Sequence, residues 1–316
     1  MNRKKTLSKA FQRGHMLTLK NGLYRNWISK FIVDEMKGDV GVKGDITTSA
    51  LFNGDNKKVK AIVKTRSDGI AAGIEEVCFL YKNNKINSKQ MKKDGQRIKK
   101  GDILLRLSGK EKNLLKVERS ASDLLERMSG IATMTSMLTK KTRGKVGIAP
   151  TRKTQWRYLD KKAVYVGGGL THRLALWESI LIKDNHLRLL IDKKIKNPVE
   201  FALGRAWKKK GQANFVEIEV TDKKRAIAAA KKFKELQGRK NNFPCLIMFD
   251  NIKPDRIKKM VRELKKQKLY NHALLEASGG INPKNISGYV NSGVDVLSLG
   301  CLTNSSKALN IKQVIV

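Results

Sequence analysis

The sequence predicts an α/β protein in which a small antiparallel sheet with helices precedes a larger set of repeated βα units. The chain has 316 residues, of which 40% are hydrophobic, so it is long enough for two domains with cores of their own. Residues 59–107 contain short strand-like runs separated by turn residues. After Gly144, short apolar runs alternate with amphipathic stretches, which is typical of parallel strands joined by helical crossovers.

The chain is strongly basic. Lys and Arg number 67 against 28 Asp and Glu, giving a net charge of +39. Such a charge suits a basic nucleic-acid-binding protein, which is one reading of the sequence. However, the excess is spread along the whole chain with few aromatic residues interleaved. We therefore interpret it as solvated helix faces and expect no specific nucleic-acid partner.

Other bulk features restrict the class of protein further. No apolar run approaches the roughly 18 residues of a membrane span, so we expect no membrane partner. Three scattered cysteines without CxxC spacing indicate neither a disulfide framework nor a zinc site. We expect a reducing compartment, the cytoplasm.

The N-terminus is basic throughout. Residues 1–33 hold eight Lys or Arg and no acid, and they lack the apolar core of a secretory signal. We expect residues 1–26 to be a disordered basic extension. An organelle-targeting peptide is the alternative.

The first domain is expected to combine helices with a small antiparallel sheet over residues 27–109. Residues 27–36 have the pattern of a short amphipathic helix, and residues 43–49 that of a tight turn or helix cap. Strands are predicted at 59–65, at 70–74 after a turn at 67–69, and at 103–107. Apolar residues then recur at helical spacing from Glu111 to Lys141; on spacing alone, Arg119 in this helix is an ordinary exposed arginine.

Seven apolar runs follow Gly144 and are predicted to be parallel strands. Their bounds are 146–149, 163–166, 180–182, 215–220, 245–249, 273–275 and 294–299. Lys-rich amphipathic stretches separate most of them. Seven βα units are enough for the sheet to close into a barrel, whose functional groups gather at the carboxyl ends of its strands.

Polar groups fall at those strand ends. In order they are Thr151, Arg152, Lys153 and Thr154; Gly167 to Gly169, Thr171, His172 and Arg173; Lys183, Asn185 and His186; Glu217 and Glu219; Asp250 and Asn251; Ser278, Gly279 and Gly280; and Gly300. Arg and Lys hold carboxylates or phosphates, and glycines let backbone N–H groups approach phosphate oxygens. This spacing predicts a site for a strongly anionic substrate.

The acids and histidines of this set allow two readings. Glu219 and Asp250 either form salt bridges to nearby cations or hold Mg²⁺ and sugar hydroxyls, because magnesium prefers one or two carboxylates together with substrate phosphates. A structural role for His186 is as plausible as a catalytic one. The late glycines, Gly279, Gly280 and Gly300, lie where the last barrel loops usually bind a phosphate.

The motifs carry a resemblance that runs from about Trp27 to Thr303. GDITT, PTRKT, AVYVGGGLTHR, SILIKDNH, VEIEV, IMFDN, LEASGGIN and SGVDVLSLGCLT, in this order, resemble the nicotinate-nucleotide pyrophosphorylase (carboxylating) family, also called quinolinate phosphoribosyltransferases. The resemblance implies an N-terminal open-faced α/β sandwich over residues 27–122, joined by the tail 304–316. It also implies a seven-stranded α/β barrel over residues 123–303, the type II phosphoribosyltransferase fold.

The resemblance also implies a reaction and its partners. Quinolinate and phosphoribosyl pyrophosphate would give nicotinate mononucleotide, pyrophosphate and CO₂, in the synthesis of NAD. Mg²⁺ would be the cofactor, and the subunits would form a homodimer or a dimer-based hexamer. A sister phosphoribosyltransferase that acts on nicotinate or another aromatic acid is the alternative enzyme.

Carried over residue by residue, the resemblance divides the site between the two substrates. It assigns Arg152, His172, Arg173 and Lys183 to the quinolinate carboxylates, with Arg119 reaching in from the other subunit. Lys153 would lie between the substrates beside Thr151, while Glu219 and Asp250 would face the ribose and magnesium. Ser278, Gly279, Gly280 and Gly300 would bind the 5′-phosphate. Where the family commonly has Pro-Gly after TRKT, this chain has Gln155 and Trp156, so we expect a different loop shape.

Overall fold

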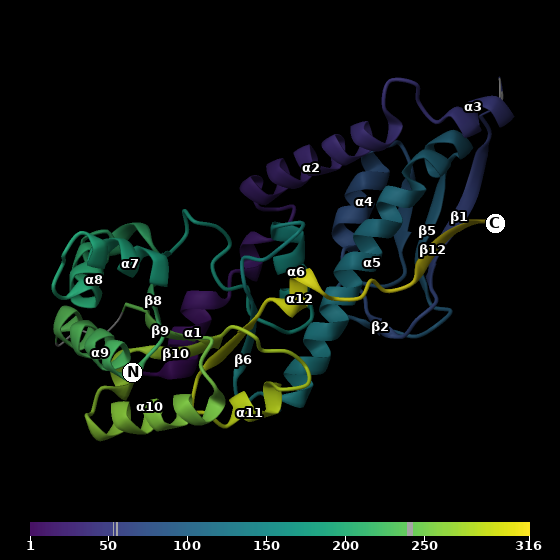
Figure 1. The fold of residues 1–316 in the computed structure, drawn as a ribbon. Coiled ribbons are helices and arrows are strands. Elements are labelled where there is room, and N and C mark those ends of the chain that lie inside the picture. The colour runs from purple at the N-terminus through teal and green to yellow at the C-terminus, as the bar shows by residue number, and fades with distance from the viewer. Residues whose placement is uncertain (53, 55, 239–242) are drawn as a thin grey trace. The chain divides into compact units, whose positions relative to one another are not determined.

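The computed structural model describes residues 1–52, 54, 56–238 and 243–316. The chain forms two compact units (Figure 1). Unit 1 contains residues 1–13, 138–154 and 169–304, and unit 2 contains residues 14–137, 155–168 and 305–316.

Unit 1 is built on a six-stranded parallel sheet with the order β6-β11-β10-β9-β8-β7. The strands are β6 (Gly147–Pro150), β7 (Ile180–Ile182), β8 (Val216–Val220), β9 (Cys245–Asp250), β10 (Leu274–Ser278) and β11 (Val296–Leu299). β8 to β11 are almost entirely buried on both faces, as expected of parallel strands covered by helices. The α/β class and the parallel sheet are therefore confirmed.

One of the seven predicted strands is wrong. Residues 163–166 end helix α6 (Tyr158–Val166), which belongs to unit 2. A run of four apolar residues does not distinguish a strand from a buried helical turn, and here Leu159 and Ala163 lie one helical turn apart, both fully buried. The chain reaches the sheet only after Gly168, where the Leu170 N–H donates to the Ile148 carbonyl of β6 at 2.7 Å. Residues near 170 thus run beside the free edge of β6.

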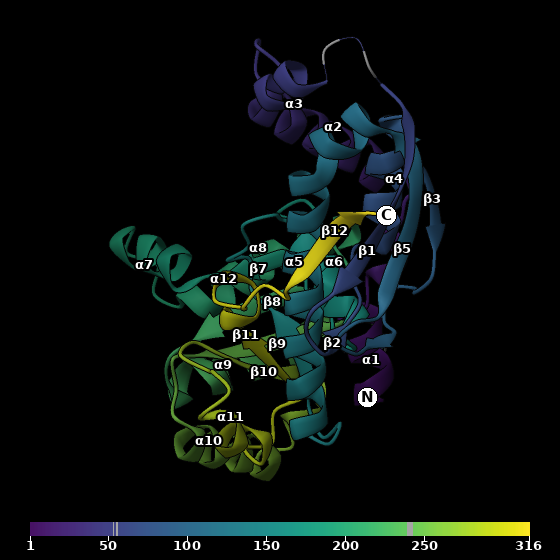
Figure 2. The same ribbon diagram turned by 90° about the vertical axis from the view of Figure 1, so that its right-hand side faces the viewer.

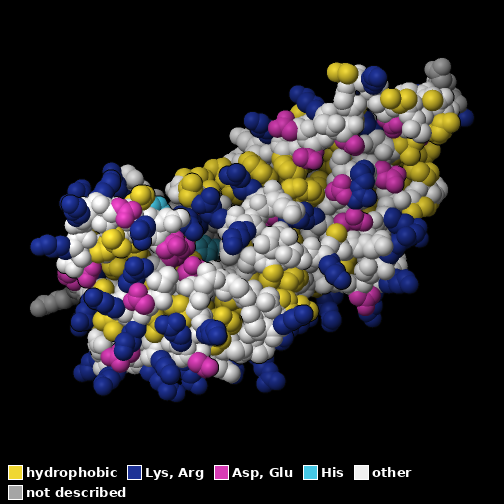
Figure 3. Space-filling view, in the orientation of Figure 1, with side chains coloured by type: hydrophobic (Ala, Val, Ile, Leu, Met, Phe, Trp, Pro, Cys, Tyr) yellow, Lys and Arg dark blue, Asp and Glu magenta, His cyan; other side chains and the backbone are white. Residues whose placement is uncertain are grey.

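Helices surround this sheet in unit 1 (Figure 2). They are α7 (Asp184–Asp192), α8 (Pro198–Lys208), α9 (Lys223–Gln237), α10 (Pro254–Lys266), α11 (Ile286–Val290) and α12 (Cys301–Asn304), with 3₁₀ turns η2 (Lys210–Gln212) and η3 (Tyr270–His272). Pro198 and Pro254 begin their helices, where a missing N–H costs nothing. In α9 the buried side is formed by Ala226, Ala229, Ala230 and Phe233, and lysines occupy much of the rest. Lys and Arg side chains are scattered across the visible face (Figure 3), in line with solvated helix faces.

The N-terminal segment corrects another expectation. Residues 1–26 are not a disordered extension. Arg3–Phe11 form helix α1, which belongs to unit 1, and Ala10 and Phe11 are buried. Residues 14–16 form the 3₁₀ turn η1 (Gly14–Met16) in unit 2. The basic composition suggested disorder, but Leu7, Ala10 and Phe11 lie on one side of a helix and provide the apolar contact that orders it.

Unit 2 contains a four-stranded antiparallel sheet with the order β12-β1-β5-β3. The strands are β1 (Lys58–Thr65), β3 (Asn87–Gln90), β5 (Ile103–Lys110) and β12 (Ile311–Ile315). The helices are α2 (Gly22–Val40), α3 (Ile46–Leu51), α4 (Ile74–Asn83), α5 (Glu111–Lys141) and α6, and α5 continues into unit 1. The C-terminal tail pairs with β1, with Val63 opposite Gln313.

The predicted strand at residues 70–74 is largely wrong. Gly69 and Ile70 form the short strand β2, which pairs with β4 (Arg97–Ile98) and not with β1. Ile74 begins α4, and the Asp94 carboxylate accepts its N–H at 2.9 Å. The cap comes from a residue twenty positions further along the chain, so local sequence could not reveal it.

The boundary between the units lies later than residue 122. Unit 2 keeps α5 up to Met137 because the C-terminal tail packs on it. A Cβ added at Gly130 would lie 2.0 Å from the Lys307 carbonyl oxygen, which explains a glycine inside this helix. The Glu126 carbonyl accepts the Leu309 N–H, and the Glu126 carboxylate accepts the Ile311 N–H.

Among the described residues, no helix combines the length and apolar character needed to cross a membrane.

Candidate active site

The predicted site residues of unit 1 gather at the carboxyl end of its sheet. Thr151 to Lys153 follow β6, Lys183 follows β7, Asp250 ends β9, Ser278 ends β10, and Gly300 follows β11. The parallel register pairs Ser278 with Asp250 and Leu299 with Pro150, so the strands end at nearly the same level. These residues therefore lie at the ends of their strands, as predicted from the sequence. Ligands of parallel α/β sheets commonly bind at this edge.

Glu219 and Lys183 form an ion pair at this edge. The Lys183 Nζ atom lies 3.2 Å from the Glu219 carboxylate, which also accepts the Asp184 N–H at 3.3 Å. Burial raises the pKa of Glu219, Lys183 opposes this, and the negative charge of Asp250 adds to the increase. Glu219 and Asp250 are thus close enough to repel each other. Two oxygen donors with surplus negative charge fit a hard divalent cation such as Mg²⁺.

Lys153 lies next to Gly300. The Thr303 hydroxyl donates to the Lys153 carbonyl at 2.7 Å. A Cβ added at Gly300 would lie 3.6 Å from the Lys153 Cδ and 3.7 Å from the Thr151 Oγ1, so the first and last loops meet here.

The glycine turn after β10 requires two residues without side chains. Gly279 and Gly280 have φ values of +89° and +65°. A Cβ on Gly279 would lie 2.3 Å from the Asn251 Oδ1, whereas a Cβ on Gly280 would meet nothing within 4 Å. Asn251 itself has a φ of 55° and donates its N–H to the Ser278 carbonyl. The side of the turn at Gly280 is therefore left open to a ligand.

Two arginines and an imidazole differ in exposure. Arg152 is exposed, whereas His172 and Arg173 are 5% and 4% exposed. Burial lowers the pKa of Arg173, and the nearby charge of Arg152 lowers it further. The Arg173 Nη1 atom donates to the Ser179 carbonyl at 3.1 Å. Neighbouring guanidinium groups attract an anion that would neutralise both of them.

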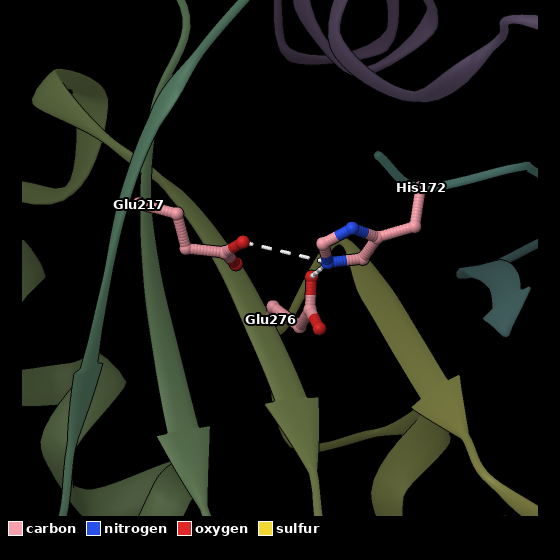
Figure 4. Close-up of side chains that lie close together, drawn as sticks. All are labelled: His172, Glu217 and Glu276. Atoms are coloured by element: carbon pink, nitrogen blue, oxygen red, sulfur yellow. Dashed lines mark ion pairs between the residues drawn. The ribbon is translucent and has the colours of Figure 1, made fainter. Parts of the chain in front are cut away.

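His172 contacts two buried glutamates that were not among the predicted substrate ligands (Figure 4). Its Nε2 atom lies 3.4 Å from carboxylate oxygens of both Glu217 and Glu276, which are fully buried. The Nδ1 atom accepts the Arg173 N–H at 2.7 Å, so in the neutral imidazole the ring proton lies on Nε2, facing the carboxylates. Burial lowers the pKa of His172, but the charges of Glu276 and Glu217 outweigh it and raise the pKa to about 9. Burial raises the pKa of Glu217 to about 8, with a further contribution from Glu276.

The sequence held a signal for this cluster. Glu217 and Glu219 are two positions apart in β8, as are Glu276 and Ser278 in β10, so each pair shares one face of its strand. Within the described residues, one group of three His, Cys, Asp or Glu side chains lies close enough together to hold a metal ion, and it consists of His172, Glu217 and Glu276. The expected magnesium ligands, Glu219 and Asp250, do not belong to this group.

His186 has a structural role. Its Nδ1 atom accepts the Lys183 N–H at 2.8 Å, so the imidazole caps the first turn of α7. Of the two readings of His186 from the sequence, this geometry supports the structural one.

Arg119 belongs to unit 2, on the exposed side of α5. It forms ion pairs with Asp123 and Glu126 of the same helix, and 61% of its side chain is exposed. The residues around it line a cavity of about 320 Å³ that includes Phe31 and Trp156.

The Gln155-Trp156 loop is held by Asp160 within unit 2. The N–H groups of Gln155 and Trp156 donate to one carboxylate oxygen of this buried aspartate at 2.9 and 3.2 Å. Arg127 binds both oxygens of Asp160 at 2.8 Å. A proline at position 155 would have no N–H to donate, so one of the two backbone bonds to Asp160 depends on the departure from the family motif.

The parallel sheet carries cations, acids and glycine turns at one edge, an arrangement that defines an α/β protein suited to a polyanionic ligand. Comparison with known proteins identifies the class further. Residues 131–313 match the C-terminal domain of quinolinate phosphoribosyl transferases, and residues 45–129 match the N-terminal domain. The chain belongs to the quinolinate phosphoribosyltransferase family.

Individual relatives agree with this assignment. The chain is 35% identical to a probable nicotinate-nucleotide pyrophosphorylase [carboxylating] of Archaeoglobus fulgidus, over 84% of this chain and 96% of the relative. It is 34% identical to the protein of the same description from Methanothermobacter thermautotrophicus, over 89% and 96%. A solved nicotinate-nucleotide pyrophosphorylase from Ehrlichia chaffeensis superposes with a TM-score of 0.75 at 32% identity, over 91% of this chain and 98% of that one.

Proposed function

We propose that the protein transfers the phosphoribosyl group of phosphoribosyl pyrophosphate to quinolinate, giving nicotinate mononucleotide, pyrophosphate and CO₂. The observation that carries this proposal is the gathering of Arg152, Lys153 and Lys183 beside Glu219 and Asp250 at one sheet edge. The relatives named as carboxylating pyrophosphorylases support it. The three cysteines are free, which fits the reducing cytoplasm.

The cations would neutralise and orient the dicarboxylate. Arg152 and Arg173 offer planar donors to carboxylates, and Lys183 adds a point charge next to Glu219. The open turn at Gly280 suits the 5′-phosphate. Four cationic or imidazole groups favour a dicarboxylate over a monocarboxylate such as nicotinate.

The proposed chemistry depends mainly on positioning and electrostatics. The bond between the ring nitrogen and C1′ forms as the bond from C1′ to pyrophosphate breaks, and the carboxylates of Glu219 and Asp250 stabilise the positive charge that develops on the ribosyl centre. The cationic charge of the ribosylated ring stabilises the electron pair that remains on C2 when the 2-carboxylate departs as CO₂, and a proton from solvent then takes the place of the carboxylate at C2. Mg²⁺, held by Glu219 and Asp250 together with substrate oxygens, would stabilise the negative charge of the leaving pyrophosphate.

The test is an assay that follows pyrophosphate and CO₂ together, with quinolinate or nicotinate as the acceptor. We expect equal amounts of both products from quinolinate with Mg²⁺, and loss of activity with a chelator. Lys183→Ala should lower kcat/KM by one to two decades, about 1.5 to 3 kcal/mol for a lost charge-assisted contact. Turnover of nicotinate as fast as quinolinate would instead favour the sister phosphoribosyltransferase.

A second part of the proposal is that Arg119 completes the site of the other subunit in a homodimer. Mixed Arg119→Ala and Lys183→Ala subunits would then restore one intact site in each heterodimer. With random assortment half of the dimers are mixed, so activity should recover to roughly a quarter of the wild type. An inactive mixture, despite subunit exchange proven by mass labelling, would contradict an arginine supplied in trans.

A further inference from the structure

The N-terminal segment closes the end of the unit 1 sheet opposite the candidate site. Ala10 and Phe11 share a fully buried cluster with residues that lie, except for Ala149 of β6, at or near the amino ends of the strands. The other members are Ala149, Phe215, Leu246, Leu274 and Val296, with Met1, Leu7 and Leu170 packed against them. This end of a parallel α/β barrel ordinarily contributes to stability. These apolar contacts alone would give the segment only a role in stability.

Its last residues also hold the stretch that carries His172 and Arg173. The Phe11 carbonyl accepts both the N–H and the hydroxyl of Thr171, at 2.9 and 2.6 Å. The Thr171 hydroxyl oxygen in turn accepts the Arg13 N–H at 3.0 Å. Thr171 is fully buried, so these bonds do not compete with water.

A second contact fixes the other side of this stretch. The Arg13 Nε atom donates to one oxygen of the Glu178 carboxylate at 2.8 Å, and the other oxygen accepts the Leu174 N–H. The Glu178 side chain is 1% exposed and that of Arg13 is 20% exposed. Residues 171–174 are thus tied to the N-terminal segment at both ends.

Phe11 also sets the His172 ring. The two rings stack with centroids 4.2 Å apart, and Phe215 meets both rings edge-on. The opposite side of the imidazole directs Nε2 at Glu217 and Glu276. His172 has a φ of 53°, an unfavourable conformation for a residue with a side chain, so its surroundings must hold it.

We propose that Phe11, Arg13 and Thr171 are positioning residues, which fix His172 and, through the hydrogen bond from the Arg173 N–H to its ring, hold Arg173 for binding of the substrate's carboxylates. The proposal rests on the proposed function, because it takes Arg173 to bind quinolinate. It gives the N-terminal helix a role in affinity for the acid substrate in addition to its role in the core. Affinity for phosphoribosyl pyrophosphate should not depend on it.

The experiment compares Thr171→Val with Thr171→Ser. Valine keeps the shape but removes the hydroxyl, whereas serine retains it. We expect Thr171→Val to raise the KM and the calorimetric Kd for quinolinate about tenfold. The KM for phosphoribosyl pyrophosphate should change less than about twofold. Thr171→Ser, which keeps the hydroxyl, should have near wild-type values.

Arg3→Gln is the matched control. Arg3 anchors the other end of α1, where its guanidinium binds Asp295 and the Tyr270 carbonyl and stacks on the Tyr270 ring. The Arg3→Gln variant should have a lower melting temperature and an unchanged KM for quinolinate. The Arg13 side chain is partly exposed, so Arg13→Gln is a second test variant that can be used if Thr171→Val does not fold. Arg13→Gln should also raise the KM for quinolinate.

The outcomes separate the two proposals. If the wild-type protein binds no quinolinate by calorimetry, the proposed function is wrong and this inference is wrong with it. If the wild type binds quinolinate and the folded Thr171→Val or Arg13→Gln variants bind it equally well, only the positioning role is wrong. If Arg3→Gln raises the KM for quinolinate as much as these variants do, the N-terminal segment contributes only to stability.

Discussion

Each unit buries a cluster of charged side chains, but the clusters differ in how their acids are paired. In unit 2, Lys162 of α6 contacts both Glu75 and Glu76 and lies 3.9 Å from Asp94, and the Tyr24 hydroxyl donates to Glu76 at 2.7 Å. Here a full cation faces the acids, and of the four Glu75 and Glu76 carboxylate oxygens only the Glu76 Oε2 is buried without a hydrogen-bond partner.

In unit 1, the corresponding acids are less well paired. All four carboxylate oxygens of Glu217 and Glu276 are buried without a normal hydrogen bond, and a single imidazole stands between them. Buried polar groups without partners are uncommon and concentrate where function requires them. We infer that the paired acids of unit 2 contribute to the free energy of unfolding, whereas the unpaired carboxylate oxygens of unit 1 lower it beside the candidate site.

Removing the cation from the unit 2 cluster should have the largest effect. Lys162→Met would leave Glu76 buried without a counter-charge, which should cost about 3–5 kcal/mol of the free energy of unfolding. Urea denaturation measures it. Lys82→Met, which changes an exposed lysine of the same unit, is the control and should stay within about 0.5 kcal/mol of the wild type. Equal stability of the two variants would mean that the buried lysine is not needed.

The unit 1 cluster should make stability fall as the pH rises. The pKa of Glu217 is raised to about 8, so the folded state binds its proton more tightly than the unfolded state. That contribution is complete below the unfolded pKa of about 4.3 and disappears as the pH rises through 8. Asp94 acts in the same direction, but only up to its pKa of about 6. Unfolding free energies from pH 6 to 8 should therefore decline, and Glu217→Gln should flatten the decline.

Neutralising one unit 1 acid should have a smaller effect of opposite sign. Glu276→Gln removes the repulsion with Glu217 at almost constant shape, so above pH 8, where Glu217 is charged, we expect a gain of about 1 kcal/mol in unfolding free energy together with a lower kcat/KM. Glu276→Ala, which leaves a cavity, should lose stability instead. A destabilised Glu276→Gln protein would show that the carboxylate is a structural partner of His172, as Glu76 is of Lys162.

The two clusters also show what could be predicted from the sequence. Lys183, Glu219, Asp250 and Ser278 follow apolar runs, and the rule that parallel strands end together is enough to bring them to one edge. The contacts of His172 depend on Glu217 and Glu276, which come from two other strands, and on Phe11, which lies 161 positions before it. The two-residue spacing in β8 and β10 places Glu217 and Glu276 on the same faces as Glu219 and Ser278, but no local pattern reveals that His172 and Phe11 join them.

The errors in the fold have the same origin. The run at 163–166 is apolar enough for a strand, and only its packing in unit 2 decides that it is helical. The segment 1–13 is polar enough for a disordered tail, and only the strand ends that cover Phe11 order it. Tertiary contacts override local preference in both cases.

The smallest effect concerns an ion pair that is not buried. Arg119 and Asp123 are 61% and 45% exposed, so Asp123→Asn should change the free energy of unfolding by less than about 1 kcal/mol. The carboxylate nevertheless competes for the guanidinium that we assign to quinolinate, so the variant should lower the KM for quinolinate modestly, and added salt should reduce the difference. Asp192→Asn is the matched control, because Arg188 and Asp192 form another exposed pair at the same helical spacing, in α7. A change in KM in both variants would reflect the general charge of the protein, and no change in Asp123→Asn would mean that the ion pair does not restrain Arg119.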